Sequence, residues 1–460
     1  MTQLWTEERL SGWGRFPQIT TQSARPVNAR ALKRSFDARG TAQLLPYGLG
    51  RSYGDSPLLE EGRMIHMRGL DRFLDFDPES GWLRCEAGVS IQELIQYFLP
   101  RGFFPPVVPG TQFVTLGGAV ANDIHGKNHH IDGTICDHIR NLKILTGSGE
   151  VITCDQTQNS ALFEATVGGL GLTGIILELE IQLCSVHGPG IEMESIRVES
   201  LDEFFEISAA SAEFTHTVSW IDCAARGARL GRGIFMRGRH SEETPNPRLL
   251  GRLERTLSPL LKLPFDAPRG VMNRFTVRAF NEAYFHKHPK GKLEQITHYE
   301  PFFFPLDFVQ DWNRIYGPDG FLQYQLVVPN DPDHLAIREV LEEISASGMG
   351  SFLAVIKEFG ERQHGGLSFP RPGVTLALDF PNYGAPLFQL LERLDAIVIA
   401  AGGRVYLGKD ARLPKESFQK MYPEWESWRA LRDEWDPEGV FSSMLGARLG
   451  LCPAREEQPR

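Results

Sequence analysis

The sequence predicts an α+β protein with two domains. The chain has 460 residues, which is too long for one simple hydrophobic core. Residues 41–183 alternate short strand and helix patterns, whereas residues 190–400 carry strand patterns separated by helices, which indicates an antiparallel sheet with helices on one face. The turn sequence HGPG at 187–190 marks the boundary. We therefore expect one domain over residues 1–187 and a second over residues 188–403.

Composition excludes several classes of protein. The net charge is −10, so a nucleic-acid partner bound through a basic surface is not expected. The N-terminus lacks the basic start and apolar core of a secretory signal, and no apolar run reaches about 18 residues. We expect a cytoplasmic protein, with peripheral contact at the inner membrane if its substrate is lipid-linked. The six cysteines form no CxxC pair, which suits reduced and mostly buried thiols.

The first domain is expected to consist of short elements. A helix is predicted over 28–39, and a strand over 41–46 leads into a glycine-rich turn. Ser90 and Glu93 have the spacing of a capping box, which predicts a helix over 91–99. The remaining elements are strands at 64–67, 73–76, 82–87, 139–146 and 151–154, the last two as a hairpin, and a short helix at 159–165.

The segment GLGLTG at 169–174 matches the dinucleotide fingerprint G-x-G-x-x-G. That fingerprint requires a helix to begin at the glycines, so that its N-terminus faces the pyrophosphate. Residues 175–183 alternate apolar and polar side chains instead, which predicts a strand. We therefore reject a Rossmann domain.

The second domain is expected to hold the antiparallel sheet. The Pro- and Arg-rich segment 240–272 is irregular and is a candidate mobile loop over the site. The predicted strands are 191–198, 217–222, 233–236, 323–328, 352–356 and 374–380, and the predicted helices are 202–210, 333–345 and 387–400.

Residues 105–133 are rich in Gly, Pro and Asn and poor in helix signal. Glycine turns let backbone N–H groups approach a ligand, and the small residues at 115–121 leave room for a bulky, phosphate-bearing cofactor. Taken alone, such a stretch is more often a set of ordinary surface turns. The spacing of His125, His129, His130 and Asp132 is not that of a zinc site, so no metal is expected.

Four segments together carry a resemblance to a known family. They are PYGLGRSYGDSP at 46–57, IHGKNHH at 124–130, ATVGGLGLTGIILELEIQL at 165–183 and GRVYLGKDAR at 403–412. They resemble the FAD-linked oxidases of the vanillyl-alcohol-oxidase/p-cresol-methylhydroxylase (PCMH) superfamily, and GRSYGD, IHGKNHH and VYLGKDAR are similar to the decaprenylphosphoryl-β-D-ribose 2′-oxidases within it. The resemblance implies FAD, a PCMH-type FAD domain completed by residues 404–460, and a substrate domain between them.

The resemblance also implies an activity. It is the oxidation of a sugar hydroxyl by hydride transfer to flavin, most specifically the 2′-hydroxyl of a polyprenylphosphoryl-β-D-ribose, as the oxidase half of an epimerase that supplies arabinan precursors of the cell wall. A separate NAD(P)H-dependent short-chain reductase would then be the pathway partner. Two alternatives stay open: an FAD-dependent oxidase or dehydrogenase of a soluble polyol, aldonolactone or 2-hydroxy acid, and a flavin-binding protein that no longer turns over.

Lys409 is the first catalytic candidate, because the matching lysine of the family lies between flavin and substrate. A lysine can act as a base when burial or a nearby positive charge lowers its pKa. Tyr53 and His125 match family residues at the flavin. Arg51 stands where covalent members often carry the linking histidine, so we expect non-covalent FAD. The other flavin contacts that the resemblance implies are Tyr47, Gly48, Gly50, Ser52, Gly54, Gly110, Thr115, Gly117, Gly118, Ala121, Gly126, Asn128, Gly174, Ile176 and Tyr406.

On the substrate side, Gln323 and Gln325 share one face of a predicted strand. Two amides that face a cavity suit sugar hydroxyls. The same pair of residues is equally typical of the solvent-facing side of an ordinary sheet. The resemblance places Lys127 at the substrate phosphate and Lys357 on the sugar side, while Trp220 is either an apolar cavity wall or a core residue.

The sequence departs from the family in the second domain. Ala377 stands where the closest relatives have a cysteine, and Val374-Thr375 where they have Trp-Asn. We expect Ala377 to change the cavity wall and to remove the target of cysteine-reactive inhibitors. The sugar and lipid specificity is therefore the part of the resemblance that these differences affect most.

Overall fold

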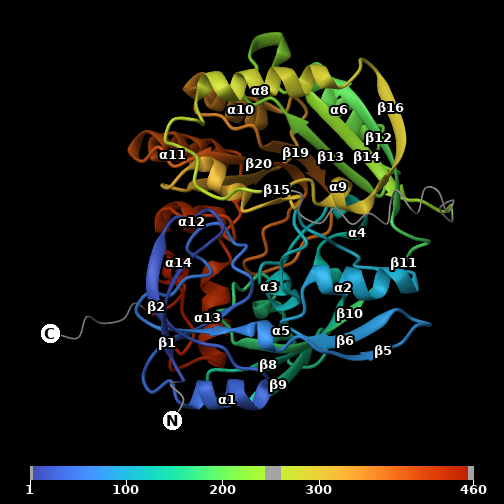
Figure 1. The fold of residues 1–460 in the computed structure, drawn as a ribbon. Helices are drawn as coiled ribbons and strands as arrows, with labels where there is room; N and C mark the ends of the chain where they lie inside the picture. The colour runs from blue at the N-terminus through green and yellow to red at the C-terminus, as the bar shows by residue number, and fades with distance from the viewer. Residues whose placement is uncertain (1–3, 244–260, 454–460) are drawn as a thin grey trace.

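The computed structural model describes residues 4–243 and 261–453, and its ribbon shows two regions stacked on each other (Figure 1). The sheets are largely local to each region. One sheet has the strand order β1-β2-β4-β3 and another the order β5-β6-β10-β8-β9. Their bounds are β1 Thr6–Ser11, β2 Gln18–Ala24, β3 Leu44–Tyr47, β4 Arg63–His66, β5 Phe73–Phe76, β6 Trp82–Glu86, β8 Ile139–Leu145, β9 Val151–Asp155 and β10 Ile175–Gln182.

The helices of the N-terminal region are short. In α2, the Ser90 side chain accepts from Glu93 N while Glu93 bonds back to Ser90, so the predicted capping box is confirmed. β10 follows directly after the glycines at 169–174, which confirms that no Rossmann helix begins there. The helices are α1 Ala29–Asp37, α2 Ile91–Phe98, α3 Leu116–Ala121, α4 His129–Asp132 and α5 Ser160–Thr166.

The weak helix signal of the stretch 105–133 predicts turns, but the structure has the two helices α3 and α4 there. Thr115 caps α3 by accepting from Gly118 N. Leu116 and Val120 are buried in a core cluster shared with the five-stranded sheet. This packing outweighs the low helix propensity of the two glycines in α3.

The upper region in Figure 1 is built on an eight-stranded sheet in which all neighbouring strands are antiparallel, with the order β16-β12-β14-β13-β19-β20-β18-β21. The helices α6, α10 and α11 share one buried cluster with it, as predicted, through residues such as Phe204, Leu341 and Leu390. The strands are β12 Gly190–Val198, β13 His216–Ile221, β14 Gly233–His240, β16 Lys292–His298, β18 Phe321–Val328, β19 Ala354–Phe359, β20 Gly373–Pro381 and β21 Arg404–Val405. The helices are α6 Leu201–Ala209, α10 Leu335–Ser347 and α11 Ala385–Ala400.

The elements between residues 261 and 303 were not predicted from the sequence. α8 (Arg274–Lys287) packs Phe285 against Trp220 and Ile234, on the face of the sheet opposite to α6. α9 (Tyr299–Phe303) follows β16, and β15 (Leu261–Lys262) pairs with β17 (Val309–Gln310). Of the segment 240–272, which was a candidate mobile loop, residues 244–260 lie outside the described residues.

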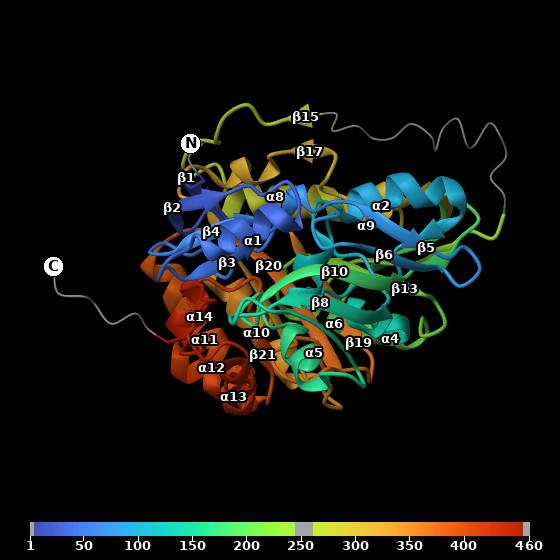
Figure 2. The ribbon, with the colours of Figure 1, turned by 90° about the horizontal axis from the view of Figure 1, so that it is seen from below.

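The C-terminal segment returns to the first region. α12 (Lys415–Met421), α13 (Trp425–Trp435) and α14 (Met444–Leu449) follow β21, and α13 lies beside α5 in both views (Figures 1 and 2). Trp428 Nε1 donates to Ala165 O at 2.9 Å, and Phe441 forms a parallel bridge with Leu44 of β3. On these contacts we propose the division 1–187, 188–403 and 404–460, with the last segment completing the first domain.

Two further expectations concern cysteines and membranes. All six cysteines are free, and only Cys184 is not fully buried. Among the residues that the structure describes, no helix combines the length and apolarity needed to cross a bilayer.

Candidate active site

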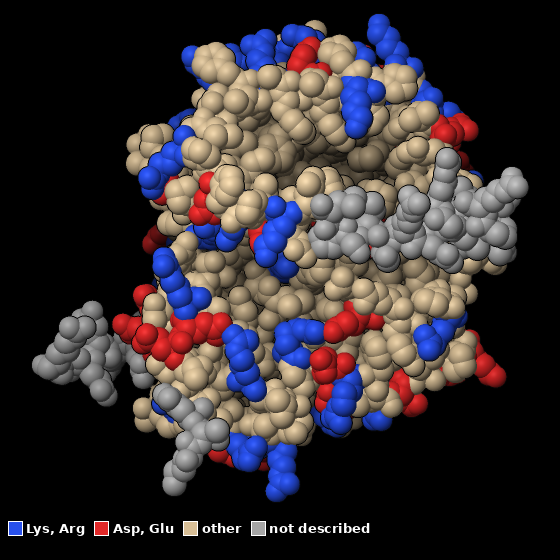
Figure 3. Space-filling view, in the orientation of Figure 1, with Lys and Arg blue, Asp and Glu red and all other residues tan. Residues whose placement is uncertain are grey.

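A cavity of about 350 Å³ lies between the eight-stranded sheet and the loops of the N-terminal region. Figure 3 shows the molecule hollowed over β13, β19 and β20. The volume of the cavity falls in the range of small-molecule sites in proteins. A molecule held there contacts the sheet on one side and the glycine-rich loops on the other.

The sheet wall follows from the two-residue alternation of β-strands. Gln323 and Gln325 of β18 line the cavity, while Leu322, Tyr324 and Leu326 are buried in the core cluster shared with α10 and α11. The alternative of a solvent face is therefore excluded for both amides. The same alternation in β19 and β20 brings Val355, Lys357, Thr375 and Ala377 to this wall.

The loop wall consists largely of backbone. Gly50 has a φ of +62°, and a Cβ added to it would lie 2.1 Å from Tyr47 Oη. A Cβ added to Gly48 would lie 2.4 Å from Thr115 Oγ1. These two positions of the 48–54 turn therefore require glycine, and they let the backbone approach a bound group closely.

The cavity is positively charged although the chain is acidic. Among the described residues its lining holds four cations, Arg51, Lys127, Lys357 and Lys409, and one carboxylate, Asp307. Desolvation lowers the pKa of Lys127 to about 8, and that of Lys357 to about 7 with help from its two lysine neighbours. None of the ion pairs found in the described part of the chain involves these three lysines. A bound anion would restore their positive charge.

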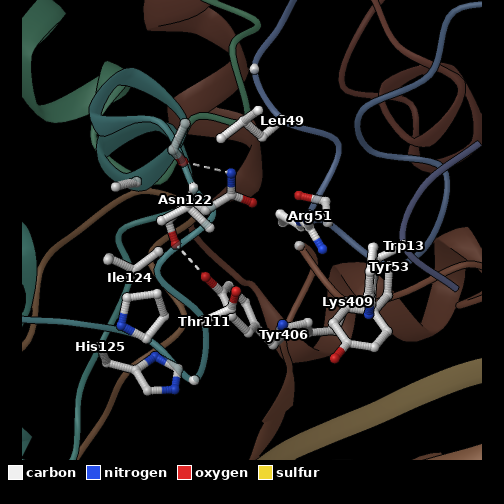
Figure 4. Close-up of a pocket in the computed structure, with 18 of the residues that line it drawn as sticks. Trp13, Leu49, Arg51, Tyr53, Thr111, Asn122, Ile124, His125, Tyr406 and Lys409 are labelled. Carbon is white, nitrogen blue, oxygen red and sulfur yellow. Dashed lines mark hydrogen bonds between the residues drawn. The ribbon is translucent and has the colours of Figure 1, made fainter. Parts of the chain in front are cut away.

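Tyr53 and Lys409 lie side by side, as Figure 4 shows. The Lys409 Nζ atom is 4.1 Å from the centre of the Tyr53 ring. Desolvation lowers the pKa of Lys409 to about 8, opposed by the nearby Asp379 carboxylate. Burial raises the pKa of Tyr53 well above its ordinary value, so this phenol stays protonated at neutral pH. Lys409 is therefore the member of the pair that can accept a proton near neutral pH.

His125 reaches the cavity from the loop that follows α3. Gln325 Nε2 donates to His125 Nε2 at 3.0 Å, so the proton of the neutral ring sits on Nδ1. Burial, and after it the positive charges of Lys357 and Lys409, hold the pKa of His125 well below its ordinary value. His125 is thus a neutral hydrogen-bond donor at neutral pH rather than a cation.

Most of the residues predicted for the site line this cavity; their individual roles stay predictions. They are Gly48, Gly50, Arg51, Ser52, Tyr53, Gly110, Thr115, Gly117, Gly118, Ala121, His125, Gly126, Lys127, Gly174, Ile176, Gln323, Gln325, Lys357, Ala377, Tyr406 and Lys409.

Two residues of the first glycine motif do not line the cavity. Tyr47 lies behind the turn, with its ring centre 5.0 Å from that of His66. Gly54 lies against the turn that carries Lys409, since a Cβ there would be 1.7 Å from Asp410 O. Their contribution is to shape the 48–54 turn and to bring it against the Lys409 turn.

Asn128 and Trp220 do not line the cavity either. Asn128 Nδ2 donates to Pro106 O at 2.8 Å and to Asp132 Oδ2 at 2.7 Å, which ties its own loop together. Trp220 Nε1 donates to Phe352 O at 2.8 Å, and its ring packs under α8 against Tyr284. Trp220 is therefore a core residue, which was the alternative considered for it.

Other lining residues were missed because they come from segments distant in sequence. The Arg51 guanidinium stacks on Trp13, 3.9 Å from its ring centre. Asp307 accepts from Gln112 N at 2.9 Å and so links the two walls, while Tyr406 Oη donates to the Asn122 backbone oxygen at 2.7 Å. No local sequence pattern points to such pairings.

The residues present fit a large, anionic cofactor. Four buried polar atoms of cavity-lining residues have no partner in the described part of the chain: Arg51 Nε, Ser56 Oγ, Asn122 Oδ1 and His125 Nδ1. Unpaired buried polar atoms are costly unless a ligand satisfies them. The glycine wall offers a close backbone approach, and Arg51 offers a cation for a pyrophosphate.

Comparison with known proteins is consistent with this fit. Residues 30–155 match a family model described as FAD binding domain, and residues 381–448 match one described as D-arabinono-1,4-lactone oxidase. The chain is 38% identical to decaprenylphosphoryl-beta-D-ribose oxidase of Mycolicibacterium smegmatis over 97% of this chain and 98% of that protein. It is 32% identical to an uncharacterized protein of Streptomyces coelicolor over 79% of this chain and 100% of that protein. It is also 23% identical to L-gulonolactone oxidase of Bos taurus, over 83% and 84% of the two chains.

Proposed function

We propose that this chain, which belongs to the family of FAD-linked oxidases that includes decaprenylphosphoryl-beta-D-ribose oxidase, oxidises the 2′-hydroxyl of a polyprenylphosphoryl-β-D-ribose to the 2′-keto sugar. The chain is an FAD-dependent oxidoreductase that acts on CH–OH groups. The finer proposal depends on one observation. Lys409, the proton acceptor in this proposal, lines the same cavity as the amides of Gln323 and Gln325 and the further lysine Lys357.

Each of the chain's own residues has a separate role in this reaction. Bound FAD supplies the acceptor for the hydride that leaves the carbinol carbon. Lys409 Nζ accepts the hydroxyl proton, because its lowered pKa leaves a useful fraction neutral near pH 8. Tyr53 keeps its proton and covers one side of the lysine. Arg51 is positioned to hold a phosphate of the cofactor.

A phosphodiester-linked sugar suits the rest of the cavity. Lys127 Nζ donates to Phe303 O at 3.1 Å, and Lys357 Nζ donates to Gly126 O at 2.7 Å. Each ammonium has three donors, so both keep donors for a ligand. Gln323 and Gln325 present amides for sugar hydroxyls. The keto product would pass to a separate NAD(P)H-dependent short-chain reductase.

The test is the visible spectrum of the purified protein under anaerobic conditions. We expect a flavin spectrum that bleaches on addition of a short-chain polyprenylphosphoryl-β-D-ribose. The match of residues 381–448 to a lactone oxidase model supports a second candidate, a soluble aldonolactone or polyol. Bleaching by such a compound, with none by the lipid-linked ribose, would establish that alternative instead. A colourless protein that binds no added FAD would contradict both.

The flavin is expected to be held without a covalent bond. The 48–54 turn carries Arg51 at the position of the linking histidine, and arginine cannot form that bond. Precipitation of the holoenzyme with trichloroacetic acid should therefore release all the yellow colour into the supernatant. Flavin that stays in the pellet would point to linkage elsewhere, and peptide mass spectrometry would locate the modified residue.

A lipid-linked substrate requires a contact with the membrane, and we propose that residues 261–292 provide it. Phe265 is 72% exposed, Phe275 69% and Leu261 61%. The segment is basic in an acidic chain, and Figure 3 shows Lys and Arg along the edge over α8. Exposed aromatics among basic residues suit an anionic bilayer surface. Its cations are Lys262, Arg269, Arg274, Arg278, Lys287, Lys290 and Lys292, and its carboxylates are Asp266 and Glu282.

This surface adjoins the cavity. β15 at its start pairs with β17, which follows the cavity residues Leu306 and Asp307. A lipid tail that leaves the cavity on this side would enter the bilayer directly.

The measurement is co-sedimentation with vesicles of phosphatidylglycerol and phosphatidylcholine. We expect binding that falls about tenfold in a Phe265→Ser/Phe275→Ser double variant, because each ring buries apolar area in the interface. Val27→Ser is the control, since Val27 is 75% exposed on the other region. Equal binding of all three proteins would contradict the assignment of this surface, and loss of binding in pure phosphatidylcholine would confirm its electrostatic part.

A further inference from the structure

Asn122 lines the cavity directly after α3, and the proposed reaction does not use its side chain. The Asn122 Oδ1 atom is buried and has no hydrogen-bond partner in the part of the chain that the structure describes. An amide oxygen that has left water without finding a donor is costly. Asn122 therefore offers an acceptor to a donor group of a bound molecule.

The backbone of α3 fixes the direction of this amide. Asn122 Nδ2 donates to Gly118 O at 2.8 Å, and Asn122 N donates to the same oxygen at 3.1 Å. A backbone carbonyl can only accept, so the amide nitrogen faces Gly118 and the amide oxygen faces away from the helix. Figure 4 shows this arrangement, with the nitrogen turned to α3 and the oxygen turned into the cavity.

Two contacts place Asn122 beside the turn that carries Lys409. A Cβ added to Gly408 would lie 2.4 Å from Asn122 Oδ1, so the amide oxygen rests against the backbone of Gly408. Tyr406 Oη donates to the backbone oxygen of Asn122 at 2.7 Å. Because Lys409 follows Gly408 directly, a flavin ring that reacts beside Lys409 also lies near Asn122.

We propose that Asn122 is a cofactor-binding residue whose side-chain oxygen accepts a hydrogen bond from a ribityl hydroxyl of FAD. The ribityl chain joins the flavin ring to the pyrophosphate, so it runs from the Lys409 turn to the Arg51 side chain. It carries three hydroxyl donors, whereas the oxidised ring carries only the N–H donor at N3. The inference rests on the proposed function in placing the ring at Lys409 and the pyrophosphate at Arg51, and not on the identity of the sugar.

Flavin analogues separate the ribityl hydroxyls from the other donors that an amide oxygen accepts. The 2′-, 3′- and 4′-deoxy analogues of FAD each lack one hydroxyl and keep the ring unchanged. In 3-methyl-FAD the ring N–H is blocked and all the hydroxyls remain. A water molecule on Asn122 Oδ1 would make the protein indifferent to every one of these changes at this position.

The test is competitive exchange of the bound flavin. The holoenzyme is incubated with equal excesses of FAD and one analogue until the bound ratio is constant, and the protein-bound flavins are then quantified by chromatography. We expect the unmodified protein to prefer FAD about tenfold over the analogue that lacks the contacting hydroxyl, which is the effect of one hydrogen bond to a buried acceptor. In Asn122→Ala this preference should disappear, because the acceptor is gone, while the ratio of FAD to 3-methyl-FAD should stay the same.

The ratios also control for a purely structural role of the amide. Asn122→Ala loses the bond to Gly118 O as well, but a general weakening of the site lowers the affinity for FAD and for every analogue alike and leaves the ratios unchanged. Asn330→Ala is the matched control, because Asn330 is exposed and its side chain contacts Glu358. All the ratios should be kept in this control.

Three outcomes would overturn the proposal. The first is equal binding of FAD and the three deoxy analogues by the unmodified protein. The second is a preference for one hydroxyl that persists in Asn122→Ala, and the third is a change in that variant confined to 3-methyl-FAD, which would assign the oxygen to the ring N–H. If Asn122→Ala does not retain flavin, Asn122→Ser removes the same oxygen and is read in the same way. The exchange needs no sugar, so the proposed substrate can fail while this inference stands.

Discussion

Replacing Lys409 with alanine is expected to lower kcat by about 10²–10⁴-fold, the range for loss of a general base. The reason is that Lys409 lies beside Tyr53 and that desolvation lowers its pKa to about 8, so that the amine can accept a proton near neutral pH. The FAD content should not change, because the glycine wall and Arg51 remain. The measurement is kcat from anaerobic single-turnover bleaching of the flavin.

The pH dependence follows from the lowered pKa. A base must be neutral to accept a proton, so the rate of bleaching should rise with pH, reach half of its maximum near the Lys409 pKa of about 8, and level off above that pH as Lys409 loses its charge. In Lys409→Ala this rise should disappear and a slow, flatter rate should remain.

Lys409→Arg separates two roles of the side chain. Arginine keeps a positive charge but does not accept a proton at any pH used. If proton transfer is the role, the arginine variant should be as slow as the alanine variant. Recovery of most of the rate in Lys409→Arg would show that the charge alone is needed, and a rate above a tenth of normal in Lys409→Ala would exclude Lys409 as the base.

The strands of the second domain were predictable because their two faces differ. In β18 the apolar Leu322, Tyr324 and Leu326 alternate with polar Gln323 and Gln325, and the structure buries the former against helices and turns the latter to the cavity. A buried core on one face fixes the register, so a pattern of period two suffices to predict it. The alternation of residue types therefore predicts which side chains of β18 line the cavity.

Other parts of the site depend on contacts that no local pattern encodes. Trp13 stacks on Arg51, and Asp307 binds the Gln112 backbone, although each pair is far apart in sequence. α3 forms despite its two glycines, because its apolar side chains are buried. The large apolar side chain of Trp220 suits a cavity wall, yet α8 covers it and makes it a core residue. In each case tertiary packing decides the outcome, and the sequence offers only residue types.

Arg448 joins three segments that the chain brings together at the back of the Lys409 turn. Its Nε and one Nη donate to Asp55 at 2.9 and 2.8 Å, and the same Nη donates to Asp410 at 2.8 Å. Asp410 also accepts from Leu413 N at 3.0 Å, which closes the turn that begins after Lys409. One guanidinium on α14 thus holds the GRSYGD segment against the GKDAR segment.

Arg448→Met should therefore destabilise the fold by about 3 kcal/mol, because it leaves two buried carboxylates without their cation. The value is at the low end for such a loss, since the Arg448 side chain is 25% exposed. The measurement is urea-induced unfolding with saturating FAD. Arg30→Met, on the exposed side of α1, is the control and should change stability by less than about 0.5 kcal/mol.

The pH dependence of that loss gives the decisive check. In the unmodified protein the arginines hold the pKa of Asp410 below its ordinary value, so this carboxylate stabilises the fold above its unfolded pKa, and the contribution is lost as pH falls through the folded pKa. Without Arg448, burial is no longer offset by that charge and the pKa values of Asp410 and Asp55 must rise. Protonation of both then relieves the penalty, so the deficit of Arg448→Met should be largest at pH 7 and should shrink toward pH 4. A deficit that does not vary with pH would mean that Arg448 acts by packing alone.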